Sequence, residues 1–384
     1  MNRSAALRLA VIAVLALAAG AAQAQFQELT MPPAGDNQKA SVSQWIGPVE
    51  VNVTYRSPDV TAPNGEDRTG KIWGQLVPYG MANLGFGTCG DHCPWRAGAN
   101  QNTVFTVSHD VLVEGKPLPA GSYGLHMIPG EEEWTLVLSK NSTSWGSFFY
   151  DAAEDALRVT VRPKKAEYTH WLTYEFTDRQ PSQATVALKW EHLAVPWTVS
   201  VPDISQIYLA GVREELRDRA GFNYQAWMRA ATYCLQSNAN LEEGLRWAET
   251  AVNNPMFGGQ ENVFSLYTLG LLQDANGKTA EGEETLTRAV HHVTATASAV
   301  HGLGRQLIGS RKPELAMKVF EANFKRHQGA WPTEVGLARG YSALGQYAKA
   351  LEHAKVALTQ APDDLNRTSL EGAIQRLSEG KDIN

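Results

Sequence analysis

The chain has 384 residues, of which 43% are hydrophobic and 19% are charged, and its formal net charge at pH 7 is -6. At roughly 150 residues per domain, this length predicts two domains, each long enough to bury a core. Acidic and basic residues are mixed along the chain without a long basic stripe, which argues against a nucleic acid as a partner.

The first 24 residues have the order of a secretory signal peptide. Arg3 and Arg8 give a basic start, residues 9–19 are apolar, and Ala22-Gln23-Ala24 forms a small-residue cleavage site. The apolar run is shorter than the ~20 residues that span a bilayer, and no later segment reaches that length. We therefore expect a periplasmic or secreted protein with no transmembrane segment after signal removal.

A linker is predicted over residues 25–45, followed by a β-domain over residues 46–202. Short alternating or apolar segments are separated there by Gly, Pro and Asn, as in strands at sandwich-like spacing. Gly115 and Gly121 favour turns, and the lack of long helical patterns favours antiparallel sheets in a β-sandwich-like fold. The expected strands are 49–55, 71–77, 102–108, 121–128, 133–139, 157–163, 170–176 and 184–190.

The period changes after Pro202, where we expect a connecting helix over 203–221 and a tetratricopeptide-like repeat domain over 222–379. The last copy, 331–362, has small and bulky residues at the positions of a 34-residue helical hairpin. Equivalent small positions lie 34, 34 and 38 residues apart, and each is expected where two helices cross closely. These positions are Thr232, Gly270, Gly304 and Ala338. The second domain is therefore predicted to be an all-α solenoid.

Two of the three cysteines, Cys89 and Cys93, lie four residues apart in a Gly-rich loop. An oxidising compartment would join them in a disulfide. A metal site that also uses His92 is the alternative, although three ligands within five residues lack the paired, distant ligands of ordinary structural zinc sites. Cys234 lies on an apolar helical face, which favours a buried, inert thiol.

Several motifs of the first domain are similar to those of the bacterial family known as domain of unknown function 2911. The resemblance covers residues 45–200, although an insert at 81–94 separates two motifs that follow each other more directly in the family. It implies an exported β-domain and no established reaction. The matching motifs are SPDV at 57–60, KIWGQLVPYG at 71–80, WRAGAN at 95–100, LPAGSYGLHMIPG at 118–130, WTLVLSK at 134–140, WGSFFYD at 145–151 and LRVTV at 157–161.

Three polar residues of these motifs are candidate ligand-binding residues, namely Arg96, Asn100 and His126. Arginine with a nearby amide and aromatic rings suits a carboxylate or a sugar face. The alternative is that Arg96 and Asn100 hold a sharp turn through backbone hydrogen bonds and that His126 is structural. The aromatic candidates beside them are Tyr79, Trp95 and Trp145.

In the repeat domain, basic and aromatic residues fall at the helix positions that line the concave surface of tetratricopeptide units. Such a row is suited to an acidic or carboxylate-bearing peptide. A solvated helical face is the alternative. The row contains Arg229, Tyr233, Tyr267, His301, Arg305 and Arg339.

No motif of a nucleotide-binding enzyme, zinc peptidase or serine hydrolase is present in a suitable structural context, and no cofactor is expected. The sequence therefore favours an exported, non-enzymatic binding or scaffold protein, in which the β-domain is a platform and the repeats bind a protein or peptide. The alternative is small-ligand binding or enzymatic activity at a pocket of the β-domain.

Overall fold

The structure is a computed structural model that describes residues 37–384. Two compact units make up the chain, one ending at Pro202 and the other spanning Asp203–Asn384. The predicted signal peptide and the first part of the predicted linker lie outside the described residues. Each unit is described by itself.

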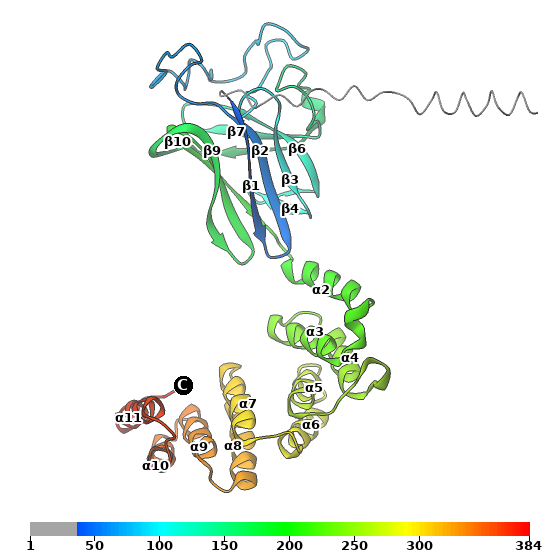
Figure 1. The fold of residues 1–384 in the computed structure, drawn as a ribbon, viewed down its shortest axis with the longest axis vertical. Helices are drawn as coiled ribbons and strands as arrows, with labels where there is room; N and C mark the ends of the chain where they lie inside the picture. Colours follow the sequence, from blue (N-terminus) through cyan, green and yellow to red (C-terminus); the bar gives the residue numbers. More distant parts are fainter. Residues whose placement is uncertain (1–36) are drawn as a thin grey trace, which may run out of the picture. The chain divides into compact units, whose positions relative to one another are not determined.

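Within the described residues, unit 1 contains ten strands in two antiparallel sheets (Figure 1). The first sheet has the order β1-β2-β3-β6-β7-β8, and the second has the order β5-β4-β10-β9. The strands are β1 (Gln38–Ile46), β2 (Val49–Ser57), β3 (Thr103–Val107), β4 (Val111–Val113), β5 (Lys116–Leu118), β6 (Gly121–Ile128), β7 (Trp134–Ser139), β8 (Asp155–Val161), β9 (Lys164–Gln180) and β10 (Gln183–Ser200).

The core of unit 1 lies between the two sheets. Every second residue of β2 is buried, as alternation of side chains across a strand requires. Tyr55 of β2 meets Tyr174 of β9 with the ring centroids 4.8 Å apart, and the Tyr55 hydroxyl accepts a hydrogen bond from the Tyr174 amide at 3.3 Å. This contact joins the two sheets, and the predicted antiparallel β-sandwich-like fold is confirmed.

Two expectations about the strands are wrong. Strand β1 occupies the last eight residues of the predicted linker, 38–45, and pairs with β2. Its exposed residues are mostly polar, so the segment lacks the apolar pattern typical of a strand. The segment 71–77 is not a strand, because Gly74, at a φ of +78°, turns the chain back and only Trp73 bridges to Val77.

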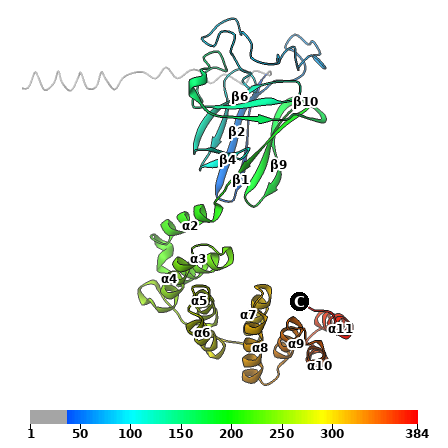
Figure 2. The same cartoon turned by 180° about the vertical axis from the view of Figure 1, so that it is seen from behind.

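Unit 2 contains ten α-helices in the part of the chain that the structure describes (Figure 1 and Figure 2). Four helical hairpins follow one another, preceded by α2 and closed by α11, so the predicted tetratricopeptide-type solenoid is confirmed. The helices are α2 (Ile204–Glu215), α3 (Tyr224–Ser237), α4 (Leu241–Asn253), α5 (Val263–Ala275), α6 (Thr279–His291), α7 (Ala297–Gly309), α8 (Pro313–His327), α9 (Trp331–Ala343), α10 (Tyr347–Thr359) and α11 (Asp364–Ser378).

The connecting helix is shorter than expected, since α2 ends at Glu215 and a 3-10 turn over Arg219–Phe222 follows. Asn223 then caps α3 by accepting a hydrogen bond from the Gln225 amide.

Small residues lie at three of the four predicted helix crossings. A Cβ added to Gly270 would approach the Gly282 carbonyl oxygen at 3.0 Å, and one added to Gly304 would overlap the ring of Phe320. The first hairpin differs from the expectation. Gly244 packs against Cys234 there, and Thr232 is only half-buried. The longer loop after α4 explains the 38-residue spacing, but it gave no sign that Gly244 would replace Thr232 at this contact.

Among residues 37–384, no helix is both long enough and apolar enough to cross a membrane.

Candidate functional site

The segment between β2 and β3, residues 58–102, forms nearly all of the lining of a cavity of about 400 Å³ in unit 1. Backbone contacts hold this long segment in place. The Arg68 guanidinium donates hydrogen bonds to the carbonyls of Asp59 and Val60, and the buried Tyr174 hydroxyl donates to the Ala97 carbonyl at 2.7 Å. The cavity is therefore formed by an anchored loop rather than by regular strands.

Of the six ligand-binding candidates, three line this cavity: Trp95, Arg96 and Asn100. Trp95 is held to β6 by two backbone hydrogen bonds with Met127, each of 2.8 Å. Tyr79 and Trp145 are exposed and do not belong to the lining. The sequence motifs of the loop therefore identified part of the cavity lining, but the exposed rings of Tyr79 and Trp145 lie outside it.

Arg96 ties down the turn in which it lies. Its Nη1 donates a hydrogen bond to the Asn100 carbonyl at 2.8 Å, and its guanidinium carbon lies 4.8 Å from the centroid of the Phe148 ring. A side chain at Gly146 would clash with this guanidinium at 2.5 Å. Burial lowers the pKa of Arg96. Asn100 contributes its carbonyl to this arrangement and has a φ of +57°, in the left-handed region.

His126 is buried and does not line the cavity. Its Nδ1 shares a hydrogen bond of 2.8 Å with the Ser147 hydroxyl, and its ring meets Tyr150 edge-on at 5.4 Å. Burial, together with the nearby charge of Arg96, lowers the pKa of His126 to about 4. The imidazole is therefore neutral near pH 7 and serves packing. Arg96, Asn100 and His126 do not converge on one pocket.

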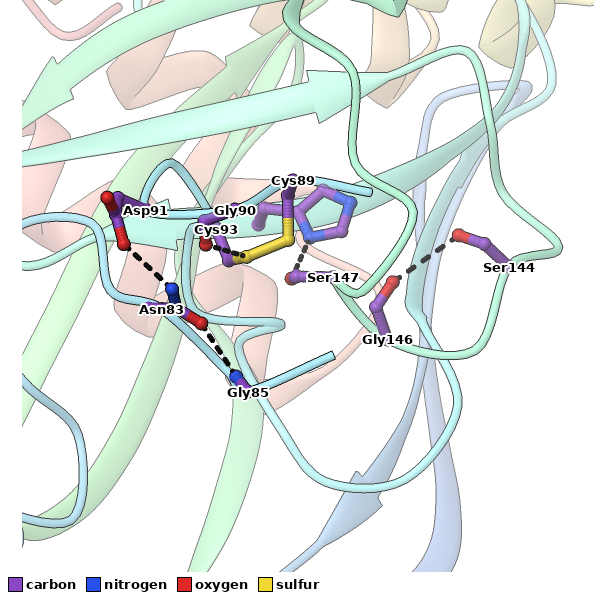
Figure 3. Close-up of a disulfide and its surroundings, with 10 residues drawn as sticks. Asn83, Gly85, Cys89, Gly90, Asp91, Cys93, Ser144, Gly146 and Ser147 are labelled. Atoms are coloured by element: carbon purple, nitrogen blue, oxygen red, sulfur yellow. Dashed lines mark hydrogen bonds between the residues drawn. A yellow bond between two sulfur atoms is a disulfide. The ribbon is translucent and has the colours of Figure 1, made fainter. Parts of the chain in front are cut away.

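Cys89 and Cys93 are joined by a disulfide (Figure 3). The loop around it is ordered by further hydrogen bonds, in which the Asn83 amide donates to Asp91 and the Asn83 oxygen accepts from the Gly85 amide. Both cysteines are buried against Val137 and Tyr150, so their sulfur atoms help form a small core. Within residues 37–384, no three His, Cys, Asp or Glu residues gather as a metal site would require.

A second hollow, of about 1220 Å³, lies in unit 2 and is called the A-helix groove here. Nearly all of its lining comes from α3, α5 and α7, the first helices of three successive hairpins. Three of the six predicted residues line it: Arg229, Tyr233 and Tyr267. Residues that the prediction missed fall at helical spacing on the same faces; they include Gln225, Met228, Gln236, Thr268 and Gln306.

The charged residues that line the A-helix groove are all positive. Its lining contains two cations, Arg229 and Lys312, and no aspartate or glutamate. Lys312 is bound to Asp274 at 2.7 Å, whereas no ion pair involving Arg229 is formed with another described residue. Tyr267 is buried and donates a hydrogen bond to the Leu303 carbonyl at 3.0 Å. Arg229 is therefore the exposed, unpaired cation of this surface.

The other three predicted groove residues, His301, Arg305 and Arg339, lie outside the A-helix groove. His301 packs beside Phe320, and its Nδ1 is buried without a hydrogen-bond partner among the described residues. Burial, together with the charges of Arg339 and Arg305, lowers the pKa of His301 to about 4. The six residues predicted to form one row therefore form two groups, three that line the A-helix groove and three that lie outside it.

An antiparallel two-sheet domain followed by a tetratricopeptide-type solenoid defines the class of protein. Residues 37–199 match the model of the family described as "Protein of unknown function (DUF2911)". No curated protein matches the chain.

Solved structures similar to this chain include repeat proteins. YrrB, described as a TPR protein with an unusual peptide-binding site, is 13% identical over 45% of this chain and 86% of its own, with a TM-score of 0.25. A kinesin light chain of Podosopora anserina with TPR-like repeats is 16% identical over 41% and 85%, with a TM-score of 0.28. MamA of Desulfovibrio magneticus RS-1 is 15% identical over 41% and 93%, with a TM-score of 0.25. Likeness at this level says nothing about the partner of this chain.

Proposed function

We propose that this chain is an exported scaffold protein whose A-helix groove binds an extended acidic segment of a partner protein. The observation that carries the proposal is the chemistry of the groove lining. Arg229 is a cation without an ion pair, and no carboxylate lines the groove. Since the chain as a whole is acidic, with a net charge of -6, this surface differs in sign from the rest of the molecule.

The uncharged groups of the groove suit a peptide rather than a compact ligand. Amide side chains such as Gln225, Gln236 and Gln306 offer both donors and acceptors to a peptide backbone. Tyr233, Phe264 and Met228 provide aromatic and flexible apolar surface beside them. An acidic peptide would pair with Arg229 while its backbone and apolar side chains occupy the remaining surface.

Export belongs to the proposal and is supported by two independent features. The first 24 residues have the order of a signal peptide. The Cys89–Cys93 disulfide fits an oxidising compartment, because thiols stay reduced in the cytosol. The alternative of a small-ligand or catalytic site in unit 1 lacks a comparable observation, since His126 lies apart from the cavity that Arg96 and Asn100 line.

Arrays of acidic peptides test the proposed groove. The mature full chain is applied to immobilised Asp- and Glu-containing peptides and to matched peptides with Lys at the same positions. We expect binding to the acidic set, and Arg229→Glu is expected to weaken it about ten-fold or more because it replaces attraction with repulsion. Lys355→Glu is the matched control, since Lys355 is exposed on α10 and does not line the groove.

Equal binding by the Arg229→Glu and Lys355→Glu variants would contradict the groove assignment. Equal binding of the acidic and the Lys-substituted peptides by the wild type would contradict the acidic ligand class.

A further inference from the structure

The segment after α11, residues 381–384, lies back against α9 and is called the closing segment here. Figure 1 and Figure 2 both place the C label beside α9 and α11. The Ser342 hydroxyl donates a hydrogen bond to the Asp382 carboxylate at 2.6 Å and accepts one from the Ile383 amide at 3.1 Å. One side chain of α9 thus contacts both a side chain and the backbone of this segment.

Arginines hold the backbone of the closing segment. Arg376 donates from Nε and Nη2 to the Asp382 carbonyl, at 3.0 and 2.7 Å, and Arg339 donates from Nη1 to the Ile383 carbonyl at 3.3 Å. The side-chain amide of Asn384 donates a hydrogen bond to the Arg339 carbonyl at 3.1 Å. Consecutive peptide groups are therefore bound as those of an extended ligand would be.

The closing segment also contains one apolar residue, Ile383, which packs against a hydrophobic cluster. Ile383 packs beside the cluster formed by Ala338, Ala350, Ala354 and Leu377. The small side chains of three alanines leave room for a branched aliphatic residue there. Backbone hydrogen bonds with one apolar anchor are the combination by which helical grooves select peptides.

Positive charge gathers around this segment. Burial lowers the pKa of Arg339 and the charge of Arg305 lowers it further, whereas the charge of Asp382 raises it. Arg305 is exposed and makes no hydrogen bond or ion pair with another described residue. The negative charge of Asp382 thus acts on Arg339, against the positive charge of Arg305. A ligand with an acid next to an aliphatic residue would meet the same charges.

We propose that the face of α9 bearing Arg339 and Ser342 is a second peptide-binding site, which takes an acidic residue followed by an aliphatic one and which the closing segment occupies as an intramolecular ligand. This proposal rests on the proposed function in one respect: the class of natural partner, an acidic protein segment, is the same. It is separate from the A-helix groove. A partner segment gains access to it only when the closing segment leaves.

The closing segment itself provides the probe. The chain lacking residues 381–384 is titrated with the synthetic peptide Gly-Lys-Asp-Ile-Asn, and the nuclear magnetic resonance signals of the peptide isoleucine methyl groups report binding. We expect saturable binding to the shortened chain and at least ten-fold weaker binding to the full chain, whose own segment competes at an effective concentration of about 1 mM. The peptide with Ala in place of Asp is expected to bind at least ten-fold more weakly.

Three variants locate the binding and separate it from the A-helix groove. In the shortened chain, Arg339→Ala should weaken peptide binding at least ten-fold, whereas Arg229→Glu and Lys355→Ala should leave it unchanged. If the shortened chain does not fold, Asp382→Ala in the full chain removes the carboxylate instead, and the peptide should then bind it more tightly than it binds the wild type.

The proposal is overturned if the peptide does not saturate the shortened or Asp382→Ala chain, or if Arg339→Ala leaves its binding intact. The closing segment would then be a packing element of the last hairpin. Neither result bears on the peptide arrays, whose outcome depends on Arg229, so the two proposals fail separately.

Discussion

His126 shows how burial decides the chemistry of a single residue. In the sequence it is a histidine at the end of an aromatic strand, beside the candidates Arg96 and Asn100. In the structure it is buried, is hydrogen-bonded to the Ser147 hydroxyl, and lies near the positive charge of Arg96. A charged imidazole loses its hydration there, so the neutral form is favoured. The residue type was visible in the sequence, and its protonation was not.

The stability of the protein is therefore expected to fall in mild acid. The pKa of His126 is about 4 in the folded chain, against about 6.5 when unfolded. The unfolded state thus binds the proton first, and stability is lost as the pH falls from about 6.5 to about 4, by roughly 3 kcal/mol in total. His126→Asn should remove this part of the pH dependence, as measured by urea unfolding across that range.

His109→Asn is the control for this measurement, because His109 is exposed. His301, whose pKa is also lowered to about 4, contributes equally to the wild type and both variants. The same pH dependence in His126→Asn and in the wild type would show that His126 does not resist protonation.

The helices were predicted more successfully than the strands because their pattern is repeated. The 34-residue spacing of small residues predicted the crossings at Gly270 and Gly304, which the structure shows. Strands lack such a repeat. The apolar segment 71–77 looked like a strand, but Trp73 instead packs among Trp95, Trp134 and Trp190 within an irregular loop. Local alternation alone does not distinguish these two outcomes.

Two glycines of α7 test the close crossing of helices. A Cβ at Gly302 has no atom within 4 Å, whereas one at Gly304 overlaps the Phe320 ring. Gly302→Ala should stabilise the protein by up to about 1 kcal/mol through helix propensity. Gly304→Ala should destabilise it by about 1–3 kcal/mol through overpacking, despite the same gain. Thermal unfolding of both variants measures the difference, and equal shifts would contradict a tight crossing at Gly304.

The whole molecule combines an anchored β-domain with a repeat array, and each unit has a hollow of its own. The cavity in unit 1 and the A-helix groove in unit 2 differ in how they are built. A long loop forms nearly all of the lining of the first, whereas equivalent helices of three repeats line the second. Repetition places similar side chains in one row, which explains why part of the groove lining was predictable from the sequence.

Export is tested on the whole chain in a bacterial host that secretes it. We expect the periplasmic or secreted fraction to contain a protein beginning at Gln25, because the sequence predicts signal-peptide cleavage after Ala24. Its intact mass without reductant should be lower by two hydrogens than its mass after reduction, as the Cys89–Cys93 disulfide requires. An unprocessed, reduced chain that stays in the cytosolic fraction contradicts export.

The sequence by itself determined the two fold classes and the family model that the β-domain matches, since strand alternation, the helical repeat and short motifs are local patterns. It also indicated which residue types carry charge and aromatic surface. It did not determine which of them meet.

Only the tertiary structure decided that His126 is buried away from the cavity, that Arg229 lies in a groove without acids, and that Ser342 is hydrogen-bonded to Asp382, 40 residues further along the chain. Such arrangements depend on contacts between distant segments and on the burial that these contacts produce. Neither can be read from the order of neighbouring residues.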